Sequence, residues 1–121
     1  MRYVIAVSQL DQVHVEPTKP DQQFALVAIL PGGIIKVRPV TPADPATAEN
    51  KAAVLRGIFV PASPPPDLGS ITADSLISST YPFKEIDLLN TSLDAEGNYN
   101  IEVANLPTGE YYVYVLAGFP G

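Results

Sequence analysis

The chain lacks several residue types on which protein chemistry depends. It contains no cysteine and no tryptophan, and its one histidine is His14. The absence of cysteine excludes disulfides, thiolate nucleophiles and cysteine metal sites. A single histidine cannot supply the two that a carboxypeptidase-type catalytic zinc needs, and no H-E-x-x-H motif or glycine-rich phosphate loop occurs. We therefore predict no catalytic residues, no cofactor and no metal ligands, and we expect no enzyme.

Basic residues are also scarce. Seven lysines and arginines stand against 13 aspartates and glutamates, which gives a formal charge of −6. Nucleic-acid binding requires clustered basic residues, and here only Lys36 and Arg38 lie close together. These two residues would share the solvated face of one strand. The acidic balance keeps a protein soluble and disfavours anionic membranes, so we expect no nucleic-acid partner.

Long apolar runs are missing as well. No run approaches the roughly 20 residues that a membrane-spanning helix needs, so we expect no membrane insertion. Between Arg2 and Ser8 only residues 3–7 are apolar, which is shorter than the apolar region of about 7–15 residues in a secretory signal. We expect a protein that is not exported by that route, or a chain given without its leader. A virion part assembled in the cytoplasm would need no leader.

Proline, by contrast, is abundant. The chain has 13 prolines in 121 residues, about twice ordinary usage (~5%), and they are scattered. Long helices have little room, because proline in a helix interior removes a hydrogen bond and clashes with the previous turn. The apolar fraction of 46% argues against disorder. The length is that of one domain, so the composition predicts a single all-β domain with many loops.

Apolar segments separated by turn residues predict seven or eight strands. The predicted strands are residues 1–10, 24–30, 34–40, 54–60, 83–89, 99–103 and 110–116, with a short edge piece at 13–15. Residues 46–55 contain good helix formers and would allow one helical turn. Residues 71–81 stay open between loop, helix and strand. This number of strands at this length is typical of one mostly antiparallel β-sandwich, Ig-like or prealbumin-like.

Residues 24–40 predict a β-hairpin. The run from Phe24 to Leu30 (FALVAIL) is continuously apolar, which favours a strand buried on both faces, although periodicity alone does not exclude a helix. Pro31, Gly32 and Gly33 then signal a turn, and the next segment alternates with Ile35 and Val37 inward. Further along, Gly57 inside a predicted strand indicates a bulge or a close backbone approach.

The last third of the chain carries a recognisable pattern. Residues 94–101 (DAEGNYNI) place an acidic-glycine turn before a strand, and residues 106–115 (LPTGEYYVYV) place an L-P-x-G-x-Y turn before a closing strand. This pattern resembles the carboxypeptidase-regulatory-like and transthyretin-like domains and is similar to the Cna-B-type domains of bacterial surface proteins. The resemblance covers about residues 55–121 and implies a β-sandwich, but it implies little about function. We therefore divide the single domain, 1–121, into N-terminal strands and a hairpin (1–54) and the part that carries the resemblance (55–121).

Two chemical features connected with these domains are not expected here. A Cna-B-type isopeptide bond needs a glutamate in the closing strand, and the position that resembles it is Val115; Glu110 and Glu102 lie elsewhere. A sortase signal needs a residue between Pro107 and Thr108 and a hydrophobic tail, and both are missing. A transthyretin-like hydrolase would use a histidine cluster, which the chain lacks.

The turn that contains Asp94, Glu96 and Asn98 has the oxygen ligands of a weak calcium site. A full site uses six to eight oxygens, and this turn offers about three. We therefore expect these side chains to bond their own backbone, as turn residues often do.

The closing strand supplies the candidate interaction residues. Tyr112 and Tyr114 share one face of it, opposite Tyr111, Val113 and Val115. If the latter face fills the core, the former presents two rings and Leu116 to sugar or another subunit; burial under the N-terminal segment is the alternative. The N-terminal strand, a candidate donor to a neighbour's sheet, contributes apolar residues too. The predicted interaction residues are Tyr3, Ile5, Tyr112, Tyr114 and Leu116.

These observations favour a non-enzymatic structural subunit of an extracellular filament, a cell surface, or a virion or tail-like assembly. Such a subunit would act as a homo-oligomer or with assembly partner proteins, by strand and face packing between copies. The strands predicted at 24–30 and 110–116 contain more apolar residues than the core of one small sandwich requires. The alternative is a monomeric carbohydrate- or peptide-binding module that uses the tyrosine face or the loop at 61–82.

Overall fold

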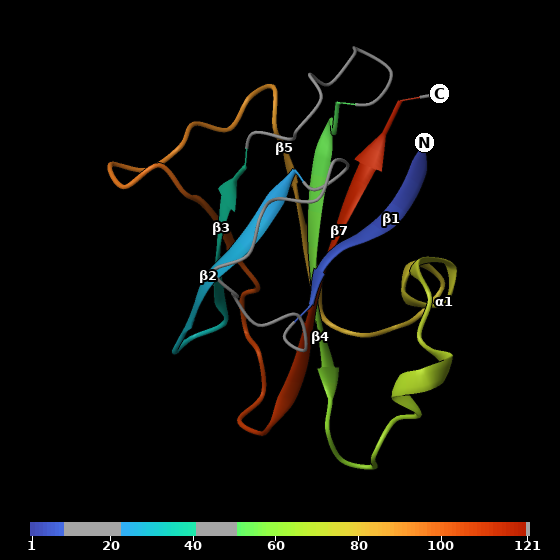
Figure 1. Cartoon of the computed structure of the whole chain (residues 1–121). Coiled ribbons are helices and arrows are strands. Elements are labelled where there is room, and N and C mark those ends of the chain that lie inside the picture. Colours follow the sequence, from blue (N-terminus) through green and yellow to red (C-terminus); the bar gives the residue numbers. More distant parts are fainter. Residues whose placement is uncertain (9–22, 41–50, 121) are drawn as a thin grey trace.

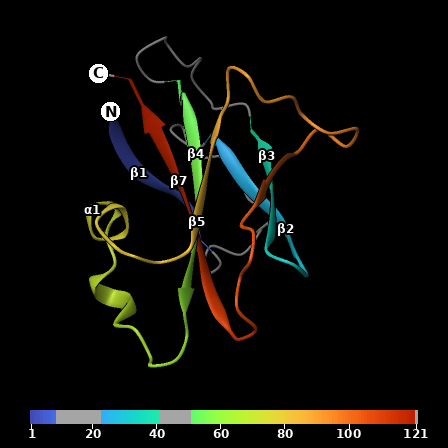
Figure 2. The ribbon, with the colours of Figure 1, turned by 180° about the vertical axis from the view of Figure 1, so that it is seen from behind.

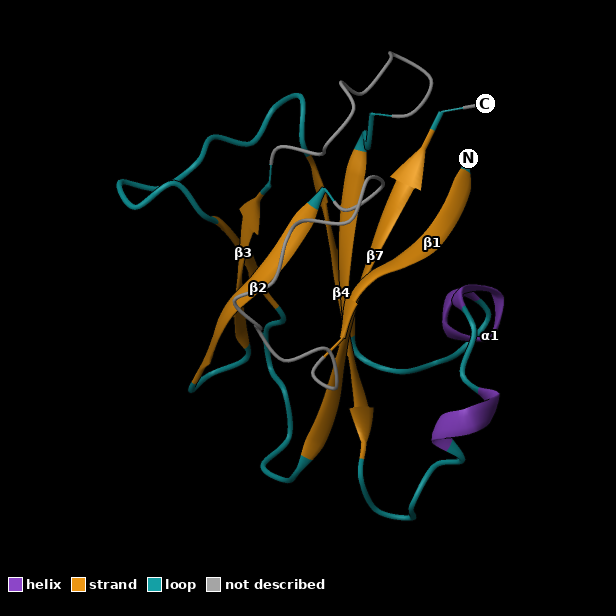
Figure 3. Ribbon diagram, viewed as in Figure 1, coloured by secondary structure: helices purple, strands orange, loops and turns teal. Residues whose placement is uncertain are grey.

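The computed structural model describes residues 1–8, 23–40 and 51–120, and this part of the chain forms seven strands in two antiparallel sheets. The four-stranded sheet has the order β1 (Arg2–Ser8), β7 (Tyr111–Phe119), β4 (Val54–Pro61) and β5 (Phe83–Asp87). The three-stranded sheet has the order β2 (Phe24–Leu30), β3 (Ile34–Pro39) and β6 (Tyr99–Glu102). The two sheets face each other (Figures 1 and 3), so the predicted all-β sandwich is confirmed.

Most strand predictions agree with the structure, and the differences have local causes. The strand predicted to reach Leu89 ends at Asp87, because the carboxylate and carbonyl of Asp87 accept hydrogen bonds from the next turn. The closing strand runs on to Phe119, because β1 and β4 pair with it on both sides. Residues 13–15 and 46–50 lie outside the described residues.

The segment that the sequence left open contains the helix. Leu68–Ser70 is one 3₁₀ turn, and α1 spans Ala73–Ile77. Thr72 begins the helix with a capping box: its hydroxyl accepts from the backbone N–H of Ser75, and the Ser75 hydroxyl accepts from the backbone N–H of Thr72. Within the described residues, no helix has the length and apolar character needed to cross a bilayer. Seen from both sides, α1 lies beyond the four-stranded sheet, away from β2 and β3 (Figures 1 and 2).

The β2–β3 hairpin forms as predicted, but its burial differs. Gly32 and Gly33 take positive φ angles of 91° and 85° in the turn, and Ile35 and Val37 are fully buried. The expectation that residues 24–30 are buried on both faces is wrong. Val27 is 40% exposed, and the last two residues of the strand are almost as open. The reason is position: β2 is the outermost strand of its sheet rather than a central one.

The main core lies between the two sheets. Its buried side chains come from the inner faces of both, chiefly Ile35, Val37, Leu55, Phe59, Ile101, Val103, Val113 and Val115. Gly57 lies on the inner face of β4, and a Cβ atom there would lie 2.6 Å from Cδ1 of Ile35 and 3.0 Å from Cγ2 of Ile101. The predicted close approach at Gly57 is confirmed, and β4 pairs with both neighbours without a register shift.

A second, smaller core lies on the outer face of the four-stranded sheet. Leu76 of α1 packs there against Ile58, Val60, Tyr114 and Leu116. The four-stranded sheet is therefore covered on both faces over part of its area. This explains why β7 is apolar at nearly every position, as a central strand requires.

The first prediction concerns Gly57. We expect Gly57→Ala to lower the free energy of unfolding by about 1–3 kcal/mol, because the added methyl overpacks a core with no space for it. Gly69→Ala is the matched control. A Cβ atom at Gly69 meets only Oδ1 of Asp67 at 3.5 Å, so its cost should stay within about 0.5 kcal/mol. Urea denaturation of both variants measures the difference, and equal stabilities would contradict the proposed packing.

Candidate interaction surfaces

The structure brings all five predicted interaction residues onto the outer face of the four-stranded sheet. Tyr3 pairs with Gly118, and Ile5 pairs with Leu116. Paired residues of antiparallel strands point to the same side, so both residues share the face of Leu116. Along β7, Tyr112 and Tyr114 alternate onto that same face. The alternation along the closing strand predicted that Tyr112, Tyr114 and Leu116 share a face, and the pairing of β1 with β7 adds Tyr3 and Ile5 to it.

Two of these residues are not available at the surface. Tyr114 is 5% exposed and Leu116 is fully buried, because α1 covers them with Leu76. The prediction of an open aromatic surface at Tyr114 and Leu116 is thus corrected, and Tyr112 is partly buried beside them. The described cover comes from residues 71–81 together with Tyr3, so the alternative of burial under the N-terminal segment holds for Tyr3, and residues 9–22 lie outside the described part of the chain. The signal that was missed is the T-x-x-S spacing of Thr72 and Ser75, which caps a helix.

The rest of this face stays open and forms what we call the aromatic–arginine patch, which consists of Met1, Tyr3, Ile5, Arg56, Phe83 and Glu85. Cζ of Arg56 lies 4.5 Å from the ring centroid of Phe83 and 5.3 Å from that of Tyr3. Phe83 is 52% exposed on β5, at one edge of the sheet, and Met1 and Ile5 are exposed at the opposite edge, beside β7. Three strands, β1, β4 and β5, contribute to the patch. Two rings and an arginine between them thus form one continuous surface.

Glu85 fixes the geometry of the patch. Its Oε1 atom accepts a hydrogen bond of 2.8 Å from the Tyr3 hydroxyl and one of 3.1 Å from Nε of Arg56. Burial, together with the nearby Glu85 carboxylate, raises the pKa of Tyr3, so its hydroxyl stays protonated as a donor. The Arg56–Glu85 ion pair leaves the centre of the patch without net charge. Sequence reasoning found Tyr3 and Ile5 but missed the other four, because strand pairing alone brings them together.

The turn around Asp94 uses its oxygens internally, as predicted. Oδ1 of Asp94 accepts from the backbone N–H groups of Glu96 at 2.9 Å and Asn98 at 3.0 Å. Oδ2 accepts from Nδ2 of Asn100 at 2.8 Å and from Nζ of Lys36 at 3.1 Å. The hydrogen bond from Asn100, followed by that from Asn98, holds the pKa of Asp94 well below its usual range.

This arrangement does not suit a cation. Both oxygens of Asp94 already accept two hydrogen bonds each, and the positively charged Lys36 ammonium group 3.1 Å from Oδ2 would repel a calcium ion bound there. Arg38, on the same face of β3, donates to Oδ1 of the buried Asn98 at 3.3 Å. Over residues 1–8, 23–40 and 51–120, no three histidine, aspartate or glutamate side chains cluster so that they could hold a metal ion.

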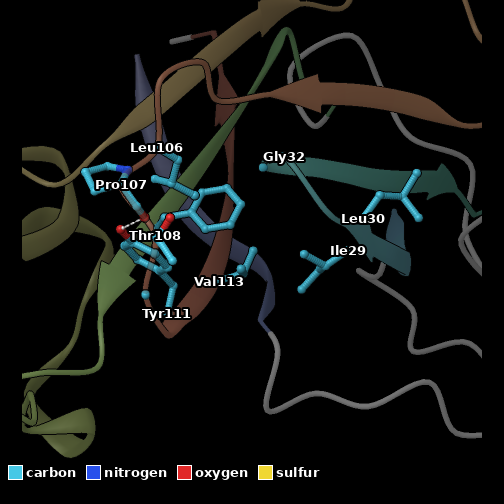
Figure 4. A pocket seen from close by; sticks show the side chains of 11 residues that line it. Ile29, Leu30, Gly32, Leu106, Pro107, Thr108, Tyr111 and Val113 are labelled. Atoms are coloured by element: carbon cyan, nitrogen blue, oxygen red, sulfur yellow. Dashed lines mark hydrogen bonds between the residues drawn. The ribbon is translucent and has the colours of Figure 1, made fainter.

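A pocket of about 590 Å³ opens at one end of the sandwich, between the β2–β3 turn and the loop at 106–109 (Figure 4). The rings of Phe59 and Tyr111 meet edge to face in its wall, with centroids 5.8 Å apart. The Tyr111 hydroxyl donates to the carbonyl of Pro107 at 2.6 Å. No charged side chain lines the pocket. Its side-chain hydroxyl groups are those of Thr108 and Tyr111, and the Tyr111 hydroxyl is engaged by the backbone.

Comparison with known proteins adds no relative. Searches of protein-family models, of curated proteins and of solved structures each found no match. The resemblance of residues 55–121 to carboxypeptidase-regulatory-like domains therefore stays a prediction. In the structure, β1 pairs with β7 and β3 pairs with β6, so residues 1–54 and 55–121 contribute strands to the same two sheets.

The second prediction concerns pH. Because the folded-state pKa of Asp94 lies below its value in the unfolded chain, its charge stabilises the fold fully above the unfolded pKa of about 3.9. That contribution disappears as the pH falls through the folded pKa. Below about pH 4, we expect the free energy of unfolding of Asp94→Asn to depend less steeply on pH than that of the unmodified chain.

Urea denaturation between pH 2 and pH 6 measures this dependence. The unfolding free energies of the two proteins should differ by a constant amount at the upper end of the pH range, and this difference should shrink toward the lower end. An unchanged slope in the variant would show that Asp94 is not the group responsible.

Proposed function

We propose that the chain is a non-enzymatic structural subunit whose copies pack against one another through the aromatic–arginine patch. The observation that carries this proposal is the make-up of the patch: two rings and a carboxylate hold Arg56 in place, Phe83 is exposed at one edge of the sheet, and Met1 and Ile5 are exposed at the other. Aromatic residues, methionine and arginine are the types enriched at protein interfaces. Because the charged and aromatic side chains are already ordered, association would lose little side-chain entropy.

The setting that we propose is an extracellular filament, a cell surface, or a virion or tail-like assembly. This part rests on the β-sandwich architecture and on the resemblance of residues 55–121, together with the apolar side chains left open on both sheets. The partner is a further copy of the chain or another assembly protein. The proposed mechanism is face packing of the four-stranded sheet, joined by strand contacts at the sheet edges.

A monomeric carbohydrate- or peptide-binding module is the second candidate. The exposed ring of Phe83, next to the polar groups of Arg56 and Glu85, is the arrangement that a sugar ring would stack on. Of the two tyrosines predicted for this role, Tyr114 is buried and Tyr112 is partly buried. Part of the loop at 61–82 is used to build α1.

The third prediction tests these two functions against each other. Static light scattering over a rising micromolar series should show that the mass of the unmodified chain grows with concentration. Ile5→Lys introduces a charge into the patch and should weaken association tenfold or more, a change of about 1.4 kcal/mol or larger. Leu89→Lys is the matched control, because Leu89 is 88% exposed in a turn outside the patch and should behave like the unmodified chain.

A chain that stays monomeric throughout the series would contradict the structural role. A glycan-binding measurement on Phe83→Ala would then decide the second candidate. Binding by the unmodified chain that is lost in this variant would support a carbohydrate module. Binding that is unchanged would remove the patch from that proposal.

A further inference from the structure

Over residues 1–8, 23–40 and 51–120 the two sheets have four edge strands, and β2 differs from the other three in its side chains. β1, β5 and β6 each carry at least one charged residue, namely Arg2, Lys84, Glu85, Asp87 and Glu102. β2 reads FALVAIL and carries none, and it has no proline. Charges and prolines are the usual means by which proteins keep a sheet edge from pairing with another chain. An edge strand without either is suited to pairing.

The side chains of β2 support the same conclusion. Val27 is 40% exposed, and Ile29 and Leu30 are 37% exposed each. On one side β2 pairs with β3, and within the described residues it is the end strand of its sheet. Its one protective feature is a bulge, seen as a register shift between Leu26 and Ala28. The bulge places Val27 outward but adds no charge.

We propose that β2 pairs with β2 of a second copy, antiparallel about a two-fold axis, so that two three-stranded sheets join into one of six strands. A strand edge offers alternating N–H and C=O groups, and the same edge turned by a two-fold rotation supplies their complement. Because β2 is uncharged, self-pairing sets no like charges opposite each other. The positive residues of the neighbouring strand β3 are already engaged, Lys36 by Asp94 and Arg38 by Asn98.

The pocket at the end of the sandwich provides space for the partner. Ile29 and Leu30 belong both to the exposed end of β2 and to the wall of the pocket (Figure 4). Side chains of a strand placed alongside β2 would therefore meet a recess lined by uncharged residues. No charged group lines that recess, so the pairing leaves no buried charge unpaired there.

This inference deepens the proposed function by naming a second contact. The aromatic–arginine patch lies on the outer face of the four-stranded sheet, whereas β2 is the edge of the opposite sheet. A subunit with one self-complementary contact forms a closed dimer. A subunit with two separate contacts of that kind forms an extended chain.

The fourth prediction uses Val27→Lys, with Ile5→Lys as its matched partner. Both substitutions place a lysine on an edge strand at an aliphatic residue of similar exposure, 40% and 36%. Sedimentation velocity should show extended assemblies for the unmodified chain and dimers for each single variant. The double variant should sediment as a monomer. Circular dichroism and melting curves check that each variant is folded.

The outcomes separate the two proposals. If the unmodified chain is monomeric at high micromolar concentration, both proposals fail. If it assembles and Ile5→Lys alone gives monomers, or if Val27→Lys assembles like the unmodified chain, the β2 contact is overturned and the patch is retained. If Val27→Lys alone gives monomers, the patch is overturned and the β2 contact is retained.

Hydrogen exchange on the unmodified chain gives a test that does not depend on any variant folding. If β2 pairs with a second copy, those amides of residues 27–30 that do not bond to β3 should exchange at least tenfold more slowly at high than at low protein concentration, since new interchain hydrogen bonds protect them. The amides of β6, an edge strand that carries a charge, serve as the internal control. Protection in β2 that does not change with concentration would overturn the proposal.

Discussion

The sandwich depends on how closely its two sheets approach at one point. At Gly57 the side chains of Ile35 and Ile101 occupy the space where a Cβ atom would otherwise lie. Ile35 comes from β3 and Ile101 from β6, two strands that pair directly with each other. At this point the three-stranded sheet contacts the backbone of β4, whereas on either side it packs on the β4 side chains of Leu55 and Phe59. The positions of the hairpin turn, the pocket and the β2 edge relative to the other sheet follow from this contact.

The four-stranded sheet shows how one surface is divided between stability and contact. Its outer face carries tyrosines, aliphatic residues and an arginine on adjacent strands, yet only one part is covered. Where α1 lies over it, Tyr114 and Leu116 are core residues. Where no helix lies over it, Arg56 is held between Tyr3 and Phe83 instead. Thus the outward-facing residues of β1 and β7 contribute to a small core where α1 covers the sheet and to the aromatic–arginine patch where it does not.

The sequence could predict those parts of the fold that depend on local pattern. The alternation of Ile35 and Val37, the turn at Gly32 and Gly33, and the tight packing at Gly57 are all visible in short segments. It failed where the outcome depends on which strand lies next to which. The continuously apolar sequence of Phe24–Leu30 predicts a strand buried on both faces, but it contains no information that β2 is an edge strand. Likewise, Arg56, Phe83 and Glu85 become neighbours of Tyr3 only through the order of strands in the sheet.

The five-residue helix α1 has a consequence for how the molecule opens. Its contacts with the sheet are few, and its start depends on the hydroxyl groups of Thr72 and Ser75. A unit of this size is expected to detach in brief fluctuations while the inter-sheet core remains intact. Each such fluctuation exposes the outer face of β7, with Tyr114 and Leu116, to solvent for a short time and makes it available for non-specific contacts. By holding α1 on the sheet, its N-terminal cap therefore limits non-specific association through β7.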